Sequence, residues 1–446
     1  MTDRSTHVAV IGAGPVGLAV AKALLQHGIP YEQLEADDDL GGNWYHGVYD
    51  SAHIISSKKT TEYADFPMPE HYPDFPSAQQ MLDYLRAYAE SYSLRLHIQF
   101  CTKVVRCVSL ADRRWEVNLA SGEQRIYKGV IVCNGHHWHK RYPHYPGTFT
   151  GEYIHSKDYQ HPNQLAGKRV LVIGGGNSAC DIASEAARVG RSCTISLRRG
   201  YWFLPKTIFG IPLPELIPSW MPVWAQRLLL KILLQIVVGK YEHYGLPKPN
   251  HRIFEAHPTL NSELLHYVKH GRIQPRPDVE RFEGDWVCFV DGTTEEFDMV
   301  VCATGFHLSF PFLPPGLVPV QGNTALLYGG CLLPDYKNLY VVGTMQARYG
   351  FGPLMTPAAD LISGLITLQE QMELPIGLVL KASGARPPPT HLLDPHRAMR
   401  QMRRAKYTLP LLLWQQRRLR KRLQPTTSPL LSQDGRVPST TEMQVF

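Results

Sequence analysis

The feature that most constrains this chain is a glycine-rich turn that occurs twice, each time between an apolar run and a helical pattern. The first turn, at residues 12–17, follows the apolar run 8–11, and the second, at residues 174–179, follows 170–173. A strand, such a turn and a helix together form the phosphate-binding end of a doubly wound α/β unit. The sequence therefore predicts two nucleotide-binding α/β domains.

The first turn carries a glycine at each fixed position of the dinucleotide-binding pattern GxGxxG. Gly12 permits the tight turn, Gly14 lets a pyrophosphate approach the backbone, and Gly17 lets the helix pack closely against the strand. The N-terminus of the helix then faces the phosphate charge. Glu35 follows Gly12 by 23 residues, where a carboxylate can accept hydrogen bonds from a ribose diol.

The second turn differs from the first at the position that faces the ribose. Ala179 takes the third, packing position, and the residue 24 positions after Gly174 is Arg198, followed by Arg199. A carboxylate would repel a ribose 2′-phosphate, whereas a guanidinium can bind it through two parallel hydrogen bonds. The contrast between Glu35 and Arg198 therefore favours FAD at the first turn and NADPH at the second.

Charge and cysteine content exclude several other classes of protein. The formal net charge is +7, yet residues 397–422 hold ten Lys and Arg and no acidic residue, which leaves 7 − 10 = −3 for the remainder. We therefore expect no nucleic-acid-binding groove. The eight cysteines include no CxxC pair, which argues against a pyridine-nucleotide disulfide reductase. Residues 1–7 contain no apolar signal region, so we expect a cytoplasmic protein.

The two strand–turn–helix units predict an α/β fold with two doubly wound Rossmann-type domains, the NADP domain inserted in the FAD domain. We expect the FAD domain at residues 1–160 and 305–385, the NADP domain at 161–304, and a basic, partly disordered tail at 386–446. A helical pattern at 79–92 and strand-like runs would complete the helices and sheets; the runs are 130–133, 287–290, 299–303 and 339–342.

Residues 203–260 are predicted to be a helical insertion in the second domain, and its apolar run at 228–238 has two interpretations. Arg227, Lys231 and Gln235 share one face of the predicted helix, and apolar residues occupy the rest. The run is shorter than the ~20 apolar residues that span a bilayer. It is either a core helix or a helix that lies on a membrane surface. The basic tail leaves a similar choice between a solvated tail and a lipid contact.

The segment 149–159, from Phe149 through His155 to Tyr159, resembles the FxGxxxHxxxY fingerprint of the flavin-containing monooxygenases. Further segments resemble motifs of that family in the same order: Gly41 to Trp44, Asp65 to Pro69, Gly176 to Ala183, Tyr244 to Leu246, His257 to Thr259 and Cys302 to Phe306. The matching motifs extend from residue 8 to about 355, so the resemblance covers most of the chain.

The resemblance implies an oxygenase that uses FAD, NADPH and O2. In this family NADPH reduces FAD, the reduced flavin binds O2, and a flavin-4a-hydroperoxide transfers one oxygen atom to a soft nitrogen or sulfur nucleophile. The cofactor supplies this chemistry, while the protein supplies orientation and a dry site. The implied partners are a small nucleophilic substrate and O2; peripheral membrane contact and a homodimer stay open.

Matching positions carry the family's cofactor-binding roles onto this chain. For FAD they are Gly12, Ala13, Gly14, Pro15, Val16, Gly17, Glu35, Gly42, Asn43, Trp44 and Ser56. For NADPH they are Gly174, Gly176, Asn177, Ser178, Ala179 and Arg198, and Thr304 belongs to a further cofactor-binding motif. Ser56 and Gln346 are the implied catalytic candidates near the flavin. The histidines at 136–139 lack the spacing of a zinc site, so no metal is expected.

One position departs from the animal members of the family. They carry an asparagine, aimed at the flavin hydroperoxide, where this chain has Ile55 in front of Ser56. An apolar side chain cannot donate a hydrogen bond, so either Ser56 substitutes or the intermediate is shorter-lived. A Baeyer–Villiger monooxygenase acting on ketones stays open, although that class ends the fingerprint with Trp where this chain has Tyr159. An uncoupled NADPH oxidase and a cofactor-binding protein without catalysis also stay open.

Overall fold

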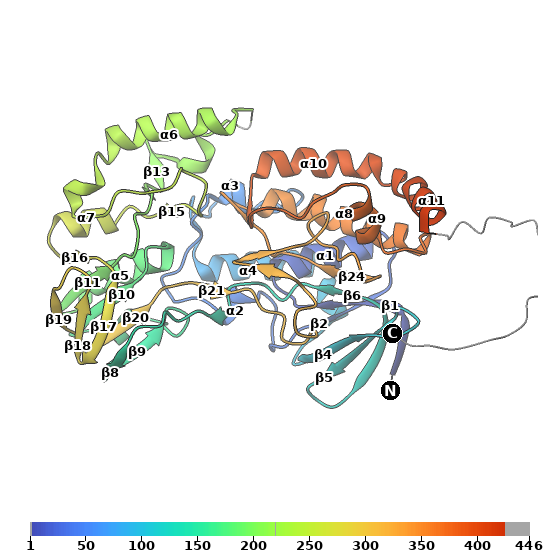
Figure 1. Ribbon diagram of the computed structural model, residues 1–446, viewed down its shortest axis with the longest axis horizontal. Helices are drawn as coiled ribbons and strands as arrows, with labels where there is room; N and C mark the ends of the chain where they lie inside the picture. The colour runs from blue at the N-terminus through green and yellow to red at the C-terminus, as the bar shows by residue number, and fades with distance from the viewer. Residues whose placement is uncertain (1, 219, 424–446) are drawn as a thin grey trace, which may run out of the picture.

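Two largely parallel β-sheets lie side by side in the computed structural model, which describes residues 2–218 and 220–423 (Figure 1). The larger sheet has the strand order β3-β2-β1-β6-β5-β4, and β24 pairs with the second half of β6. β1 pairs in parallel with both β2 and β6, whereas β4 and β5 are antiparallel. Its strands are β1 (Thr2–Ile11), β2 (Tyr31–Leu34), β3 (Ile98–Gln99), β4 (Val104–Ser109), β5 (Trp115–Leu119), β6 (Gln124–Val132) and β24 (Leu339–Val341).

The second sheet has five parallel strands in the order β16-β11-β10-β20-β9. Alternate residues of its central strand face different layers, as the two-residue period of a strand requires. Val170 and Val172 pack with helix α5, while Leu171 and Ile173 pack with a separate, smaller sheet. The elements are β9 (Glu152–His155), β10 (Arg169–Ile173), β11 (Ser192–Ser196), β16 (Ile273–Arg276), β20 (Met299–Cys302), α5 (Asn177–Val189) and α7 (Leu264–Lys269).

The sheet that covers the second sheet has the order β19-β18-β17-β8, in which β17, β18 and β19 are antiparallel and β8 pairs in parallel with β17. It contains the strand predicted at residues 287–290, so that run forms a separate layer instead of extending one of the two nucleotide-binding sheets. The separation follows from register, because among the residues that the structure describes β18 pairs only with the neighbouring strands β17 and β19. The strands are β8 (Gly147–Phe149), β17 (Val279–Gly284), β18 (Trp286–Phe289) and β19 (Thr294–Glu296).

Helix α1 (Pro15–Gln26) is covered on nearly every side because it packs between the larger sheet and helix α8 (Gly352–Glu370). Its residues from Gly17 to Leu24 are all buried, including Lys22, whose ammonium group pairs with Asp65. Helix α4 (Ala78–Ser91) confirms the helical pattern predicted from residue 79. It begins with a capping box, in which Ser77 and Gln80 satisfy each other's backbone N–H groups.

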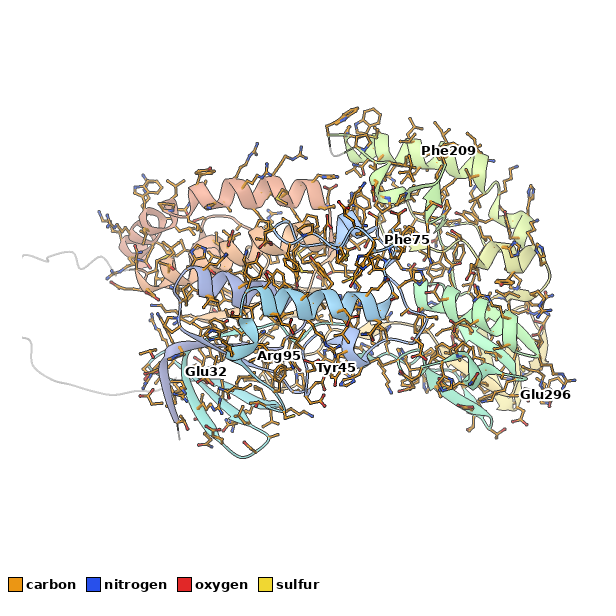
Figure 2. All side chains as sticks on the ribbon, turned by 180° about the vertical axis from the view of Figure 1, so that it is seen from behind. Glu32, Tyr45, Phe75, Arg95, Phe209 and Glu296 are labelled. Atoms are coloured by element: carbon orange, nitrogen blue, oxygen red, sulfur yellow. The ribbon has the colours of Figure 1, made fainter. Side chains whose placement is uncertain are left out.

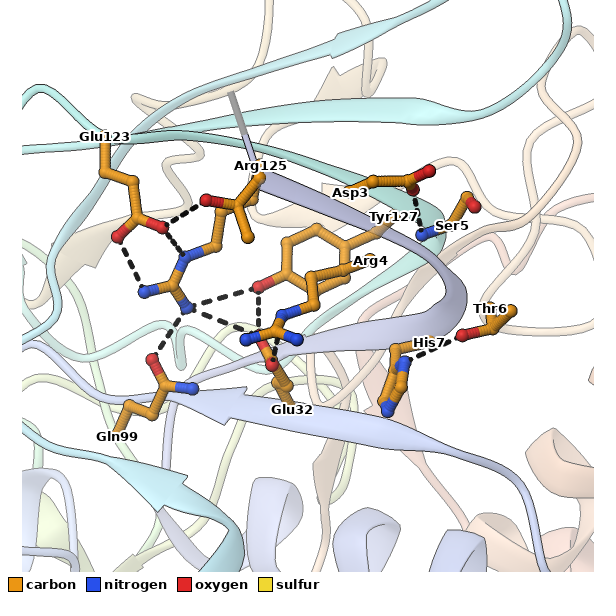
Figure 3. Close-up of polar contacts among 11 residues, drawn as sticks. Asp3, Arg4, Ser5, Thr6, His7, Glu32, Gln99, Glu123, Arg125 and Tyr127 are labelled. Carbon is orange, nitrogen blue, oxygen red and sulfur yellow. Dashed lines mark hydrogen bonds and ion pairs between the residues drawn. The ribbon is translucent and has the colours of Figure 1, made fainter.

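An ion-pair network fixes the first half of β1 to the larger sheet (Figure 3). Arg4 Nε lies 2.8 Å from Glu32 Oε1, and Arg125 Nη2 lies 2.8 Å from Glu123 Oε2. The Tyr127 hydroxyl donates to Glu32 at 2.6 Å. The Arg125 guanidinium lowers the pKa of the Glu123 carboxyl to about 2. These contacts join β1, β2 and β6 at the edge remote from the glycine turn.

The insertion carries helix α6 (Val223–Val237), which forms at the apolar run predicted from the sequence. Gln226, Leu230 and Leu234 are buried, and the two leucines pack in an apolar cluster of the insertion. The opposite side of the helix is exposed, so α6 is neither a fully buried core helix nor detached from the fold. None of the helices within residues 2–218 and 220–423 has the length and apolar character needed to cross a membrane.

The basic C-terminal region, predicted as a partly disordered tail, is helical over much of its described part. It forms helices α10 (Pro395–Thr408) and α11 (Leu411–Leu423), which pack against α8 and α9 (Ile376–Ala382) respectively. Asp394 caps α10 by accepting a hydrogen bond from Arg397 N–H at 2.9 Å, and Leu412 is buried in the core. Local capping and a few apolar contacts therefore order this part, while residues 424–446 lie outside the described residues.

Short elements complete the chain. The helical ones are α2 (Asn43–His46), α3 (Lys58–Thr61) and turns at Leu94–His97, Pro162–Leu165, Leu213–Glu215 and Tyr241–Tyr244. The strands are β7 (His139–Lys140), β12 (Phe203–Leu204), β13 (Thr207–Ile208), β14 (Ile211–Pro212), β15 (Thr259–Leu260), β21 (Phe306–His307), β22 (Val320–Gln321), β23 (Thr324–Ala325), β25 (Gln346–Ala347) and β26 (Leu392–Leu393).

Gly17→Ala is expected to destabilise the protein because a Cβ there would overlap the carbonyl oxygen of Gly12. Forced overlap of this kind costs about 1–3 kcal/mol or more. Gly14→Ala is the matched control, since its Cβ would meet only Gly42 Cα, at 3.8 Å. Urea unfolding of nucleotide-free protein, followed by circular dichroism, measures both. Equal stability of the two variants would contradict the close helix–strand packing.

Candidate functional site

The first glycine turn meets the end of β2 at the carboxyl edge of the larger sheet. Glu35 Oε2 accepts a hydrogen bond from Ala13 N–H at 2.5 Å, and Gly41 N–H donates to the Ala13 carbonyl at 3.0 Å. Burial raises the pKa of the Glu35 carboxyl, although backbone N–H groups that bond to it act in the opposite direction. The turn, the carboxylate and the Gly41 segment thus form one unit at the carboxyl end of β1. There the chain leaves β1 and its neighbouring strands β2 and β6 in different directions, which is the usual ligand position in such sheets.

The glycines of the two turns divide into those that the protein encloses and those that face open space. Gly12 and Gly174 have φ values of +105° and +130°, and a Cβ on either would collide with a neighbouring backbone carbonyl. By contrast, a Cβ on Gly176 would meet nothing within 4 Å, and one on Gly14 only Gly42. The backbone is therefore open on the side from which a pyrophosphate would approach, so both turns fit a dinucleotide.

The second turn is braced by the insertion. Asn177 Oδ1 accepts a hydrogen bond from Leu260 N–H at 2.8 Å, and the Thr259 hydroxyl donates to the Gly175 carbonyl at 2.9 Å. Ser178 and the buried Ala179 follow in the first turn of α5. The Asn177 side chain is thus already engaged with protein, so its role at this position includes holding the turn.

Arg198 and Arg199 lie just beyond β11, at the same carboxyl edge as the second turn, and both are exposed. Arg199 lies over the ring of Tyr201, with 5.3 Å between the guanidinium carbon and the ring centroid. Among the residues that the structure describes, Arg198 makes no hydrogen bond or ion pair. Its guanidinium is therefore available for an anionic ligand at the end of the sheet.

Asn43 connects the first domain to the fingerprint segment. Its Oδ1 accepts a hydrogen bond from Lys157 Nζ at 3.0 Å, and its Nδ2 donates to the His137 carbonyl at 3.1 Å. Gly42 and the half-buried Trp44 flank it, and the Cα of Gly42 lies against Gly14. Burial lowers the pKa of Lys157.

Gln346 lies beside a histidine that follows β6. Its side-chain nitrogen Nε2 is 2.9 Å from His137 Nε2, while His136 Nδ1 is 2.9 Å from the Gly343 carbonyl. Solvent reaches His137, yet desolvation by the residues around it lowers its pKa well below the usual range, and burial also lowers the pKa of His136. Burial lowers the pKa of His257 to about 4. At neutral pH these imidazoles are therefore neutral hydrogen-bonding groups rather than cations.

Ser56 and Thr304 do not join Gln346 in this arrangement. Ser56 Oγ lies 2.8 Å from Thr61 Oγ1, and the Thr304 hydroxyl donates to the Arg141 carbonyl at 2.5 Å. Ile55 packs against the apolar cluster of the insertion. The Ser56 hydroxyl is therefore bonded to Thr61, and within the described residues it makes no hydrogen bond to Gln346.

The fingerprint itself joins the two sheets. His155 is fully buried and its Nε2 lies 3.0 Å from the Gly305 carbonyl at the end of β20, while the Tyr159 hydroxyl donates to Glu185 on α5. Ser51 from the first domain bonds to the same Glu185 carboxylate. The fingerprint residues therefore hold the linker and the two domains in place.

Sequence reasoning overlooked the contacts of His137 and Lys157. The histidine stood in a pattern considered only as a metal site, and the lysine stood between fingerprint positions. No group of three or more His, Cys, Asp or Glu within residues 2–218 and 220–423 is placed to hold a metal ion. The adjacency of residues 137, 157 and 346 depends on three distant segments meeting, which no local pattern reveals.

Comparison with known proteins gives a consistent assignment. Residues 5–363 match the family described as "Flavin-binding monooxygenase-like". Flavin-containing monooxygenase 5 of Homo sapiens is 34% identical over 402 residues, covering 82% of this chain and 75% of the relative. Dimethylaniline monooxygenase [N-oxide-forming] 2 of Rattus norvegicus is 33% identical over 374 residues, covering 76% of this chain and 69% of the relative.

The fold also resembles a solved structure. Flavin-containing monooxygenase from Stenotrophomonas maltophilia superposes with a TM-score of 0.61 and 23% identity, covering 82% of this chain and 99% of that chain. At this identity the likeness concerns the fold alone. It agrees with the two largely parallel sheets and confirms the predicted pair of dinucleotide-binding domains.

Proposed function

Because this chain belongs to the flavin-binding monooxygenase family and is an FAD-dependent monooxygenase that uses NADPH, we propose that it oxygenates a soft nitrogen or sulfur atom of a small molecule with O2. The observation that carries the proposal is the pair of open glycine turns, one beside Glu35 and the other beside Arg198, joined by the fingerprint. The name of the rat relative, which forms N-oxides, supports nitrogen as an acceptor atom.

Residues of the first turn and its surroundings would hold FAD. The segment Gly12–Gly17 offers the N-terminus of α1 to the pyrophosphate, and Glu35 would bind the ribose. Gly42, Asn43 and Trp44 would line the next part of the FAD site. When bound, FAD supplies hydride acceptance from NADPH and activation of O2. The protein's part is to orient the ring and to exclude water.

Residues of the second turn would hold NADPH. Gly174, Gly176, Asn177, Ser178 and Ala179 offer the N-terminus of α5 to its pyrophosphate. Arg198 would bind the 2′-phosphate, since its guanidinium is exposed and engaged by no described residue. Thr304, held by Arg141, would keep the end of β20 in position between the two cofactors.

Gln346 and His137 would act at the flavin. An amide and a neutral imidazole 2.9 Å apart can donate and accept hydrogen bonds without placing a positive charge at the ring. Ser56 stays a weaker candidate because its hydroxyl is bonded to Thr61. A Baeyer–Villiger reaction on ketones is the second candidate, favoured by one observation: Ile55 presents an apolar side chain where the animal enzymes have a hydrogen-bond donor.

We also propose peripheral contact with a membrane, because α6 and α10 lie along the same side of the molecule in both views (Figures 1 and 2). Four apolar residues at four-residue intervals on α6 are exposed: Trp224, Leu228, Ile232 and Ile236. Phe209, at 84% exposure, belongs to the same insertion (Figure 2). The exposed arginines of α10 would attract anionic lipid while the apolar stripe enters the headgroup region.

Oxygen transfer is tested with purified enzyme, NADPH and isotopically labelled O2. N,N-dimethylaniline and methyl phenyl sulfide should yield an N-oxide and a sulfoxide that carry one labelled oxygen per NADPH consumed. Mass spectrometry of the products measures this, with a peroxide assay in parallel. An ester or lactone as the main product from a ketone panel would favour the Baeyer–Villiger reaction, and peroxide equal to NADPH consumed would indicate an oxidase.

Arg198→Ala is expected to lower kcat/KM for NADPH by about 10- to 100-fold, because charge-assisted hydrogen bonds are worth about 1.5–3 kcal/mol. The value for NADH should change little. Arg199→Ala is the matched control, since that guanidinium rests on Tyr201. Equal use of NADH and NADPH by the unmodified enzyme would refute the assignment of Arg198.

Membrane contact is tested by flotation with vesicles that contain phosphatidylserine. Replacing Leu228, Ile232 and Ile236 together by Ser should abolish flotation, because it removes the apolar area that enters the lipid. Leu96→Ser, at a position 85% exposed elsewhere, is the control and should float like the unmodified protein. Flotation that survives the triple substitution would place the contact elsewhere.

A further inference from the structure

A small pocket lies where the insertion, the segment after Gln346 and the C-terminal helices meet. Its volume is about 150 Å³, and its wall includes Thr60, Pro214, Tyr349, Leu354, His396 and Met399. No Asp, Glu, Lys or Arg belongs to the lining. Burial lowers the pKa of His396, so its imidazole is neutral at neutral pH. The pocket therefore suits an uncharged, apolar group.

Residues close in sequence to both candidate catalytic residues line this pocket. Ser56 bonds to Thr61, which adjoins the wall residue Thr60, and Gln346 is followed three positions later by the wall residue Tyr349. The Tyr349 hydroxyl donates to Gln226 of α6 at 2.9 Å, which fixes its ring against the insertion. Ile55, in front of Ser56, packs against the same apolar cluster as Tyr349, so the Ile55–Ser56 segment and this wall of the pocket share that cluster.

The C-terminal segment supplies one side of the pocket and is held tightly in place. β26 pairs in parallel with β25, the strand that contains Gln346. Arg348 Nη1 lies 2.9 Å from Asp394 Oδ2, with both side chains only 14% exposed. Asp394 also caps α10, whose first turns contribute His396 and Met399. One carboxylate therefore sets both the start of α10 and its position over the pocket.

This side of the pocket lies beyond the residues that the family match covers, which end at residue 363.

We propose that this pocket binds the apolar substituent of the oxygenated substrate, a group about the size of one aromatic ring, and that Met399 of α10 limits its size. The proposal rests on the proposed monooxygenase function for the identity of the reaction. A cavity of about 150 Å³ with apolar walls is large enough for a benzene ring. A neutral aryl sulfide or aryl amine is thus favoured over a charged or purely polar substrate.

Fluorine NMR with 4-fluorophenyl methyl sulfide measures binding to the full-length, oxidised protein without turnover. Met399→Trp should weaken binding at least about tenfold, since the larger side chain would fill the pocket. Met402→Trp is the matched control, because Met402 is also half-buried on the same helix and is not part of the lining. It should bind the probe within about twofold of the unmodified protein.

Met399→Ala provides an independent check, because a smaller side chain cannot disturb the fold by crowding the pocket as Trp could. It should improve binding of the larger 2-naphthyl methyl sulfide relative to the phenyl compound. In turnover assays Met399→Trp should raise KM for methyl phenyl sulfide far more than KM for dimethyl sulfide, which has no ring to place.

Equal binding by the unmodified protein, Met399→Trp and Met399→Ala would overturn the proposal, as would equal losses in Met399→Trp and Met402→Trp. If binding depends on Met399 but no sulfide is oxygenated, the pocket stands and the proposed function fails. If sulfides are oxygenated without dependence on Met399, the function stands and the pocket assignment fails.

Discussion

Two carboxylates of α5 fix the relative position of the two domains, on which the site depends. They do so by accepting hydrogen bonds from the first domain and from the linker. Glu185 accepts from Ser51 and Tyr159, and Asp181 accepts from Tyr49 at 2.8 Å. Burial raises the pKa of both phenols, so they stay protonated and donate. Hydrogen bonds to charged groups contribute about 1.5–3 kcal/mol each, enough to hold two domains in one relative position.

That relative position turns two separate nucleotide sites into one reaction site. The carboxyl ends of β1, β6, β10 and β20 supply the first turn, the segment of His137, the second turn and Thr304. Lys157, within the fingerprint, reaches Asn43 of the first domain. If the domains shifted, the Gln346–His137 pair would survive within the larger unit, but its relation to the second turn would be lost.

Local patterns in the sequence predict most of the secondary structure of this protein. They do not predict which layer a strand joins or which distant segments come into contact. The strand–turn–helix units and the helix after Ser77 have strong local signals in glycine spacing, capping and period. The apolar run at 287–290 predicts a strand, but the pattern of its residues does not indicate which sheet the strand joins. The basic region after 394 resembles a solvated tail by charge, yet an Asp cap and a few buried apolar side chains order it as helices.

The sequence by itself determined the two cofactors and the family, because glycine spacing, the residue at the ribose position and the fingerprint are each local and specific. Only the tertiary structure decided which groups surround the reaction. His137 meets Gln346 across 209 positions, and Arg348 meets Asp394 across 46. Such contacts depend on how the sheets, the insertion and the C-terminal helices pack, and the substrate pocket is therefore a property of the fold.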